Sequence, residues 1–415
     1  MRTPESRVHS TADRVGPPCD DASDLLQEFY RGFSGPFAGF DDDLMKYLVV
    51  EHARAMVRSF LDLHGDLLAL RMPVLFDFLE AASSADVSFE AAWSPAFGRV
   101  AALAFTESAD ADEICAAAVE FAWHLAAEGT IGRWSANVAS PLTLRLGRFV
   151  LPPATSVTAE HVDGSIQFSL RLVGGTASDY RFARQSSCWI PSERCGPFHS
   201  NEEIESVTFL TQDAGSIYSH AYLDSQILPT DRLGIALGAH RRAMRLLDDC
   251  APAYARWVRR LLRTTIPLET RTGGINSGSS REEPGVIHAS IDCAVEGYSE
   301  MLVHEVTHQH FYVLARLGAV EDGSDKNLYY SPFKQTGRPI AMILLAYHAF
   351  ANVVLLGRAC RRSAQMMGSD YFERNEAFLL PQIEVLEQAL QQTRGLTPIG
   401  SALWEPLAEQ LRARE

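Results

Sequence analysis

The stretch EMLVHEVTHQHFYVLARLG, residues 300–318, decides how the C-terminal half of the chain folds. Apolar residues recur in it at helical spacing, it contains no proline, and Gly318 is a typical helix stop. His304 and His308 are four residues apart, so a helix places both imidazoles on one face, about 6 Å apart along its axis. The stretch therefore predicts a helix with two histidines stacked on it.

This spacing is that of the HExxH motif, in which two imidazoles bind one divalent metal ion. Glu305 projects to a neighbouring sector of the helix, from which a carboxylate can act on metal-bound water without being a ligand. The alternative is a pair of ordinary core or surface histidines. His310 faces elsewhere and is expected at the surface or beside a ligand. Glu300 is either an unrelated exposed residue or orients His304 from one turn earlier.

An open catalytic metal site needs a third protein ligand. His348 is the favoured candidate, because it interrupts an apolar run and the long loop 319–337 allows its helix to pack against the first one. Otherwise His348 is a histidine of the hydrophobic core. The alternative ligands are the carboxylates of the loop, namely Glu321, Asp322 and Asp325.

The rest of the chain indicates an α+β fold that is mostly helical. Apolar residues alternate with polar ones in two stretches, at 142–146 and 166–172, which predicts a small antiparallel sheet spanning about 138–212. A further strand is expected at 285–292, directly before the HExxH helix. The predicted regions are a disordered segment 1–22, a helical region 23–135, a β-rich region 136–227 and a helical HExxH region 228–415.

Composition narrows the class of protein. The chain has 415 residues, of which 47% are hydrophobic, and a formal net charge of −15, which does not suit binding to nucleic acid. Its seven cysteines form no CxxC pair, which favours free thiols in a reducing compartment. The longest apolar run, 341–357, is shorter than the ~20 residues of a membrane span. We expect a cytoplasmic protein with no membrane segment.

Three segments carry a resemblance to a known family: GVIHASID (285–292), MLVHEVTHQHFYVLARL (301–317) and YYSPFKQTGRPIAMILLAYHAFANV (329–353). Together they resemble the HEXXH-motif peptide-modification proteins, which are encoded with ribosomally made, post-translationally modified peptides. The resemblance covers roughly 228–364. It implies an iron(II)- and 2-oxoglutarate-dependent oxygenase that hydroxylates the β-carbon of residues in a ribosomal precursor peptide. It also implies that His304 and His308 bind the iron.

The chain departs from this family at one place. Members often read Leu-His-Gly-x-Tyr-Ala-Phe in the second helix, whereas here Leu345 and Ala346 replace His-Gly and His348 stands at the Tyr position. His348 is one helical turn from Leu345, which leaves the third ligand open. A cationic anchor is needed for the distal carboxylate of 2-oxoglutarate. Arg338 is the first candidate for that anchor and Lys334 the second, with a surface salt bridge as the alternative.

Two further functions stay open at this point. A zinc metallopeptidase would use Glu305 as general base, but the third histidine of the metzincin pattern is replaced by Leu314. A catalytically degenerate homologue would only bind the precursor peptide, for instance by strand addition to the predicted sheet. Tyr329 and Tyr330 either line the pocket or are packing residues.

Overall fold

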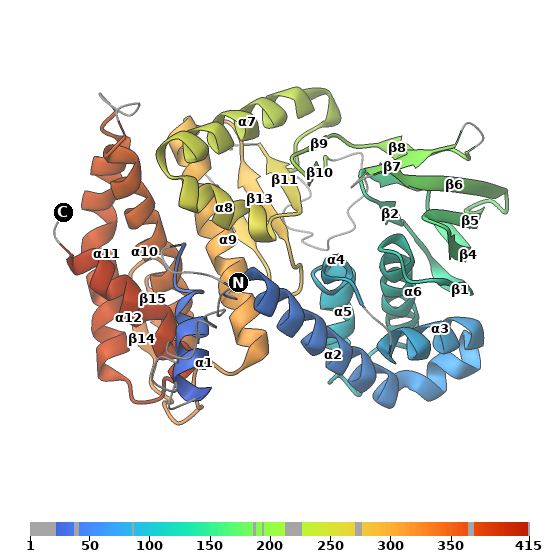
Figure 1. Cartoon of the computed structure of the whole chain (residues 1–415), viewed down its shortest axis with the longest axis horizontal. Helices are drawn as coiled ribbons and strands as arrows, with labels where there is room; N and C mark the ends of the chain where they lie inside the picture. The colour runs from blue at the N-terminus through green and yellow to red at the C-terminus, as the bar shows by residue number, and fades with distance from the viewer. Residues whose placement is uncertain are drawn as a thin grey trace, which may run out of the picture.

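The computed structural model of the chain describes residues 22–36, 41–84, 87–185, 188–192, 195–211, 226–269, 276–363 and 369–413. The segment expected to be disordered, 1–22, lies outside these residues except for Ala22, where the first helix begins. Helices and two main sheets are arranged side by side, with the N-terminal helices and the antiparallel sheet at one end and the C-terminal helices at the other (Figure 1). The predicted α+β class is confirmed.

The N-terminal region is helical, as expected. Its helices are α1 (Ala22–Arg31), α2 (Asp42–Arg71), α3 (Pro73–Ser84), α4 (Phe89–Ala92), α5 (Pro95–Leu103) and α6 (Ala111–Ala127). Side-chain caps set where several of them begin: Asp41 accepts a hydrogen bond from the amide of Leu44, and Asp110 accepts from the amides of Asp112 and Glu113. These caps satisfy amides that have no partner inside the helix.

Helix α1 is covered only at its C-terminal end. Leu25 and Leu26 are 58% and 47% exposed, whereas Phe29 is buried and Phe33, just beyond the helix, is fully buried. The helical spacing was correct, but only the C-terminal end of α1 is covered. That end packs near α12 (Pro398–Arg412), so the described N-terminus lies against the C-terminal helices (Figure 1).

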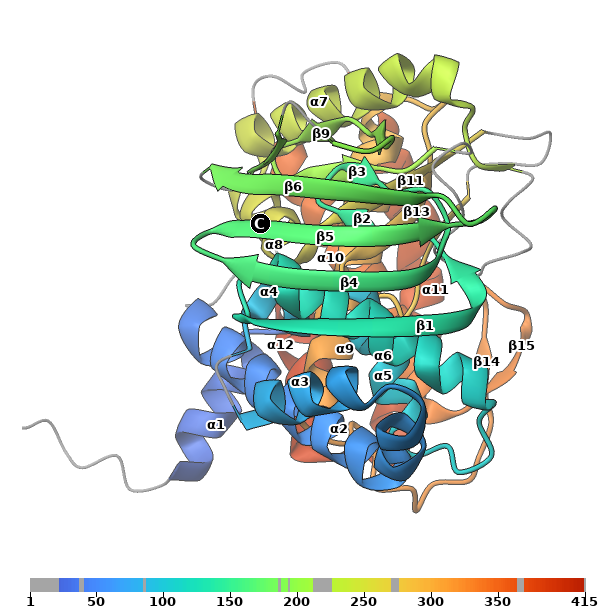
Figure 2. The ribbon, with the colours of Figure 1, turned by 90° about the vertical axis from the view of Figure 1, so that its right-hand side faces the viewer.

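The expected antiparallel sheet consists of β1 (Gly132–Leu142), β4 (Ala154–Val162), β5 (Ser165–Leu172), β6 (Ala177–Gln185) and β7 (Cys188–Pro191). These strands lie in the order β1-β4-β5-β6-β7, each antiparallel to the next, and Figure 2 shows the sheet face on. Ile166, Phe168 and Leu170 point into the core, as their alternation predicted. The hairpin between β4 and β5 turns at Asp163 and Gly164, which both have positive φ and match the twist of the strands. A small sheet joins β2 (Arg145–Leu146), β3 (Phe149–Val150) and β8 (His199–Ser200).

A second, mixed sheet lies in the middle of the molecule. It consists of β9 (Glu203–Ile204), β10 (Val207–Phe209), β11 (Thr264–Leu268), β12 (Ser277–Ser279) and β13 (Val286–Ser290), in the order β12-β13-β11-β10-β9. Strands β10, β11 and β13 are parallel, while β9 and β12 are antiparallel to their neighbours. Strands from both sides of residue 227 therefore share one sheet.

Two features of this sheet correct the sequence prediction. The strand expected at 285–292 exists as β13, but it is an interior strand, so it offers no free edge beside the HExxH helix. The edge position belongs to β12, in a Gly/Ser-rich stretch that was predicted to be a loop. Its sequence, Ser-Gly-Ser, has low β-propensity, which is why the pattern did not reveal a strand.

The C-terminal region contains η3 (Thr230–Arg232), α7 (Leu233–Cys250), α8 (Pro252–Leu261), α9 (Val295–Leu317), α10 (Ile340–Arg361), α11 (Tyr371–Gln392) and α12, with a hairpin of β14 (Tyr329–Ser331) and β15 (Thr336–Arg338). The predicted helix stop at Gly318 is confirmed, Pro252 begins α8 directly after α7, and Thr397 caps α12. The hairpin was expected to be loop. Helix α10 is long and apolar enough to cross a membrane, yet most of it is buried inside the protein.

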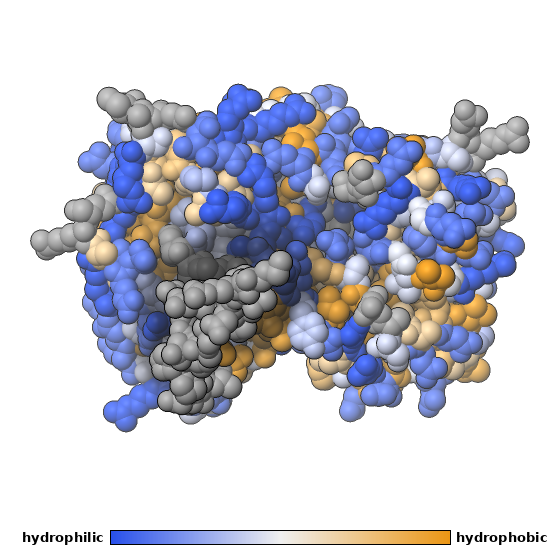
Figure 3. Space-filling model, in the orientation of Figure 1, coloured by the Kyte–Doolittle hydropathy of each residue, from blue (hydrophilic) through white to orange (hydrophobic). Residues whose placement is uncertain are grey.

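The surface on one face of the molecule is mostly hydrophilic. On the face shown in Figure 3, hydrophilic residues predominate and apolar residues are interspersed among them.

Candidate metal centre

Helix α9 holds the two histidines of the HExxH motif. Its apolar residues pack into the core, with Leu302, Val303 and Val306 fully buried, and this packing fixes the rotation of the helix. His304 and His308 are partly exposed on the remaining face. Their ring centroids are 4.7 Å apart and the rings are nearly perpendicular. The predicted pairing of the two imidazoles on one helix face is thus present.

Aromatic rings enclose this face. The ring of Phe350, in α10, lies 4.7 Å from that of His304, and Phe333, in the β14–β15 turn, stacks on Phe350 at 3.6 Å. Tyr312, one turn after His308, lies 6.3 Å from it. Such a surround lowers the local polarity and strengthens electrostatic interactions at the imidazoles.

The hairpin that precedes α10 brings two cations towards His308. Burial holds the pKa of His308 well below its usual value, and His304, His348, Arg338 and Lys334 lower it further. Arg338 lies in β15, directly before the first residue of α10, and Lys334 lies in the turn of the hairpin. The two candidate anchors for a carboxylate therefore act on the same imidazole, which stays neutral and able to bind a metal ion.

Glu305 is buried and is held by two serines of β12. The hydroxyl of Ser277 donates to Oε1 at 2.6 Å, and that of Ser279 donates to Oε2 at 2.8 Å. Oε1 lies 4.0 Å from Nε2 of His304. Sequence reasoning missed both serines. The signal that could have found them is the period-two Ser-Gly-Ser followed by Pro284-Gly285, a turn, and then by a strand.

Gln309 holds the connection between β12 and β13. Its Oε1 accepts from the amide of Gly285 at 3.1 Å, and its Nε2 lies within 3.3 to 3.5 Å of the carbonyl oxygens of Ser280, Glu283 and Val286. Glu305 and Gln309 are four residues apart on α9. Two buried polar residues of one helix face thus attach the β12–β13 hairpin to α9.

His348 does not lie with the histidine pair. Its Nε2 donates to the carbonyl oxygens of Phe33 and Ser34, at 2.8 and 3.1 Å, and its ring centroid lies 6.1 Å from that of Phe311. Burial lowers its pKa to about 4, so the imidazole is neutral. Its Nδ1 is buried and accepts no hydrogen bond from the described part of the chain. Because Nε2 carries the proton, Nδ1 has a free lone pair.

The three loop carboxylates face the turn between α11 and α12 instead. Asp325 accepts from the hydroxyls of Thr393 and Tyr329 at 2.5 and 2.6 Å, and these bonds, that of Thr393 first, lower its pKa to about 2. Asp322 accepts from the amide of Ser324, and Glu321 forms an isolated bridge with Leu396. Tyr329 is therefore a partner of Asp325, and Tyr330 is exposed.

His310 corrects the prediction of a surface residue. It is fully buried, its ring stacks on that of Trp257 at 3.3 Å, and its Nε2 bonds to the main-chain oxygen of Trp257. Spacing showed only that it faces away from His304 and His308. It could not show that α8 covers that side of α9.

Glu300 is largely buried, one turn before His304. Its Oε2 accepts from the hydroxyl of Tyr371 at 2.8 Å and from Nδ2 of Asn375 at 2.7 Å, both in α11. Burial raises the pKa of Glu300, and the two hydrogen bonds and His304 oppose that shift. Glu300 therefore joins α9 to α11, and the described residues show no hydrogen bond between Glu300 and His304.

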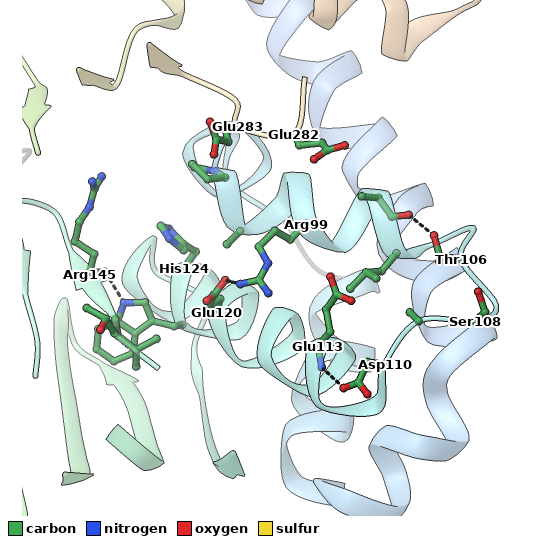
Figure 4. A pocket seen from close by; sticks show the side chains of 18 residues that line it. Arg99, Thr106, Ser108, Asp110, Glu113, Glu120, His124, Arg145, Glu282 and Glu283 are labelled. Atoms are coloured by element: carbon green, nitrogen blue, oxygen red, sulfur yellow. Dashed lines mark hydrogen bonds and ion pairs between the residues drawn. The ribbon is translucent and has the colours of Figure 1, made fainter. Parts of the chain in front are cut away.

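A separate cavity of about 590 Å³ lies between α5, α6 and the β12–β13 connection (Figure 4). Arg99 and Glu120 form an ion pair of 2.6 Å in it, and His124 lines it with a pKa lowered to about 4 by burial and then by Arg145. The residues predicted for the metal site do not line this cavity.

The donor set at α9 supplies two imidazoles on one face, and burial keeps that of His308 neutral. Within the described residues no group of three or more His, Cys, Asp or Glu side chains is arranged to hold a metal ion. The pair fits two positions of a divalent ion, and the unpartnered Nδ1 of His348 is the remaining nitrogen of the predicted set. Comparison of the chain with protein-family models and with curated protein sequences gives no match.

Proposed function

We propose that the protein is a metal-dependent peptide-tailoring enzyme of peptide natural-product biosynthesis, and that it hydroxylates a ribosomal precursor peptide with iron(II) and 2-oxoglutarate. The observation that supports the proposal is the pair of imidazoles on α9, together with two hairpin cations, Arg338 and Lys334, that both lower the pKa of one of them, His308. Two metal-binding imidazoles beside a cationic anchor suit a cosubstrate that chelates the metal ion with one end and carries a carboxylate at the other.

In this proposal His304 and His308 would hold the iron. Nδ1 of His348, which is not grouped with them in the described residues, stays the third ligand that the sequence predicted, and a His348→Gln variant tests it. Bound iron(II) would activate dioxygen: one oxygen atom would enter a carbon–hydrogen bond of the peptide, and the other would enter 2-oxoglutarate, which leaves as succinate and carbon dioxide. Arg338 pairs with the distal carboxylate of 2-oxoglutarate, with Lys334 adding a second positive charge. Phe350, on which Phe333 stacks, covers one side of the imidazole of His304. We place this chemistry in the cytoplasm, without nucleic acid or membrane as partner.

The zinc metallopeptidase is the less well supported function. A general base needs a carboxylate oxygen that is free to take a proton from water. Each carboxylate oxygen of Glu305 already uses one of its lone pairs to accept a hydroxyl hydrogen bond from β12, so fewer remain to take a proton from water. The degenerate peptide-binding homologue would share the fold but would neither consume 2-oxoglutarate nor cleave peptide.

The test is a reaction of the full chain, reconstituted anaerobically with iron(II), with 2-oxoglutarate, oxygen and the precursor peptide encoded beside its gene. We expect succinate and a peptide heavier by one oxygen atom, and neither in the His304→Ala/His308→Ala variant. A cleaved peptide with zinc would support the metallopeptidase. An unchanged peptide with no succinate would support the degenerate homologue.

A further inference from the structure

We propose that Glu305 is a positioning residue, which fastens the edge strand β12 to the metal-binding helix and does not act as a base. The contacts of Glu305 carry this inference, and only the activity measurement below rests on the proposed function. It assigns a structural role to the residue that the HExxH motif usually reserves for proton transfer.

The geometry is that of a two-point attachment. Ser277 and Ser279 alternate with Gly278 along β12, so both hydroxyls lie on the same face of the strand and reach one oxygen each. Ser279 also lies 3.3 Å from the main-chain oxygen of Glu305. Hydrogen bonds to an ionised carboxylate are short and stronger than neutral ones. The strand is therefore fixed in both register and distance relative to α9.

The burial of Glu305 makes these bonds necessary. Its side chain is buried, with only 3% of the residue exposed, and a buried carboxylate without hydrogen-bond donors would be strongly destabilising. The two serine hydroxyls supply the donors that water would otherwise provide. Removing the serine hydroxyls leaves the buried carboxylate unsatisfied, which costs more than the loss of an exposed bond.

Apart from its pairing with β13 and the hydrogen bonds between Asn276 and Ser290, strand β12 is held by its attachment to α9. It has three residues and pairs with β13 on one side, and its Ser-Gly-Ser sequence offers no apolar side chain for packing. A Cβ added at Gly278 would meet no atom within 4 Å. Gln309 anchors the following turn, so Glu305 and Gln309 together hold the hairpin beside His304 and His308.

The first measurement is hydrogen exchange of the amides at 277–279 in the full chain, without metal or substrate. Three variants separate the roles: Glu305→Gln, Glu305→Ala and Ser277→Ala/Ser279→Ala. Glutamine can accept from one serine and donate to the other, so Glu305→Gln should change exchange less than about threefold. Glu305→Ala and Ser277→Ala/Ser279→Ala should raise the hydrogen-exchange rate of these amides about tenfold or more, because each removes the hydrogen bonds between the carboxylate and the strand. The control Ser108→Ala, an exposed serine of the α5–α6 turn, should change nothing.

The second measurement is turnover under the proposed reaction. We expect Glu305→Gln to keep kcat within about threefold, whereas Ser277→Ala/Ser279→Ala should raise the KM for the peptide more than it lowers kcat. A general base would instead lose about 10²-fold or more in kcat in Glu305→Gln, since proton transfer of this kind contributes 10²–10⁴-fold. A loss of this size in kcat for Glu305→Gln, together with unchanged hydrogen exchange in Ser277→Ala/Ser279→Ala, overturns the inference.

The exchange measurement needs no catalysis, so it decides the attachment even if the proposed reaction is wrong. If Glu305→Ala does not fold, the serine variant alone tests the attachment, because it leaves the carboxylate in place. Unchanged exchange at 277–279 in the serine variant contradicts the inference in every case.

Discussion

His348, in the middle of α10, donates a hydrogen bond of 2.8 Å to the main-chain oxygen of Phe33, which is 315 residues earlier in the sequence. The same nitrogen reaches the oxygen of Ser34, and Asn352, one turn later, donates to that oxygen as well. These bonds tie the end of α1 to the C-terminal helices. They also fix the proton on Nε2, which is the arrangement of a metal-binding histidine whose other nitrogen is anchored by the protein.

Replacement of His348 separates its two roles. His348→Gln keeps a donor for the two carbonyls but removes Nδ1, so we expect the free energy of unfolding to fall by only about 1 kcal/mol, the net worth of one hydrogen bond. Metal affinity should fall about 10–100-fold, comparable to the loss of other residues that support a metal site. Chemical denaturation and metal titration measure the two effects.

The matched control is Asn352→Ala. It removes a hydrogen bond to Ser34 from the same helix face but no candidate ligand, so it should lower stability and leave metal affinity unchanged. If His348→Gln binds metal as tightly as the wild type, His348 is a residue of the core only.

Arg338 should govern the affinity for 2-oxoglutarate. Arg338→Ala removes a bidentate partner for a carboxylate, and we expect the KM for 2-oxoglutarate to rise about tenfold or more. The KM of Arg338→Lys for 2-oxoglutarate should lie between those of the wild type and Arg338→Ala, since an ammonium group keeps the charge but does not reproduce the guanidinium geometry. Steady-state succinate formation measures this.

Lys326→Ala, an exposed lysine of the loop before the hairpin, is the control and should leave the KM unchanged. A normal KM in both Arg338→Ala and Lys334→Ala would remove these cations from the site.

Acid should destabilise the protein partly through His240. Burial lowers the pKa of this histidine from its usual 6.5 to about 4, with Arg259 adding to and Glu205 opposing the shift. Its folded-state pKa is depressed, so below pH 6.5 the unfolded chain takes up a proton that the folded protein does not. The free energy of unfolding therefore falls as the pH falls from 6.5 towards 4. The part of this loss that is due to His240 is about 2 kcal/mol between pH 7 and pH 5.

The measurement is denaturant unfolding of His240→Gln at both pH values. The variant should lose less stability than the wild type on going to pH 5, although it starts lower at pH 7 because packing against Phe209 and Tyr298 is lost. His199→Gln, an exposed histidine, should keep the wild-type pH dependence. An equal loss in His240→Gln would show that His240 is protonated in the folded state as well.

Local patterns in the sequence were sufficient for most helices and for the antiparallel sheet. Thr397 caps α12 and Pro252 breaks the α7–α8 segment because capping and proline geometry depend on a few neighbouring residues. The histidine pair was predictable for the same reason, since the spacing of His304 and His308 and the helix that carries them are both local properties.

Tertiary relationships were not predictable in this way. Strand β12 has no strand-forming residues and exists because β13 pairs with it and Glu305 of α9 binds its serines. His310 is buried because α8 covers it. His348 bonds to Phe33 because the end of α1 packs against the C-terminal helices. Each depends on a segment distant in sequence, which periodicity and spacing do not reveal.

Metal content is the most direct test of the central claim that His304 and His308 together hold a divalent ion. The full chain is loaded anaerobically with iron(II), freed of excess metal and measured by elemental analysis. We expect about one iron per chain for the wild type and for His199→Ala, and almost none for His304→Ala/His308→Ala, because a divalent ion is not retained once two of its nitrogen ligands are removed. Iron content in the double variant equal to that of the wild type would contradict the account.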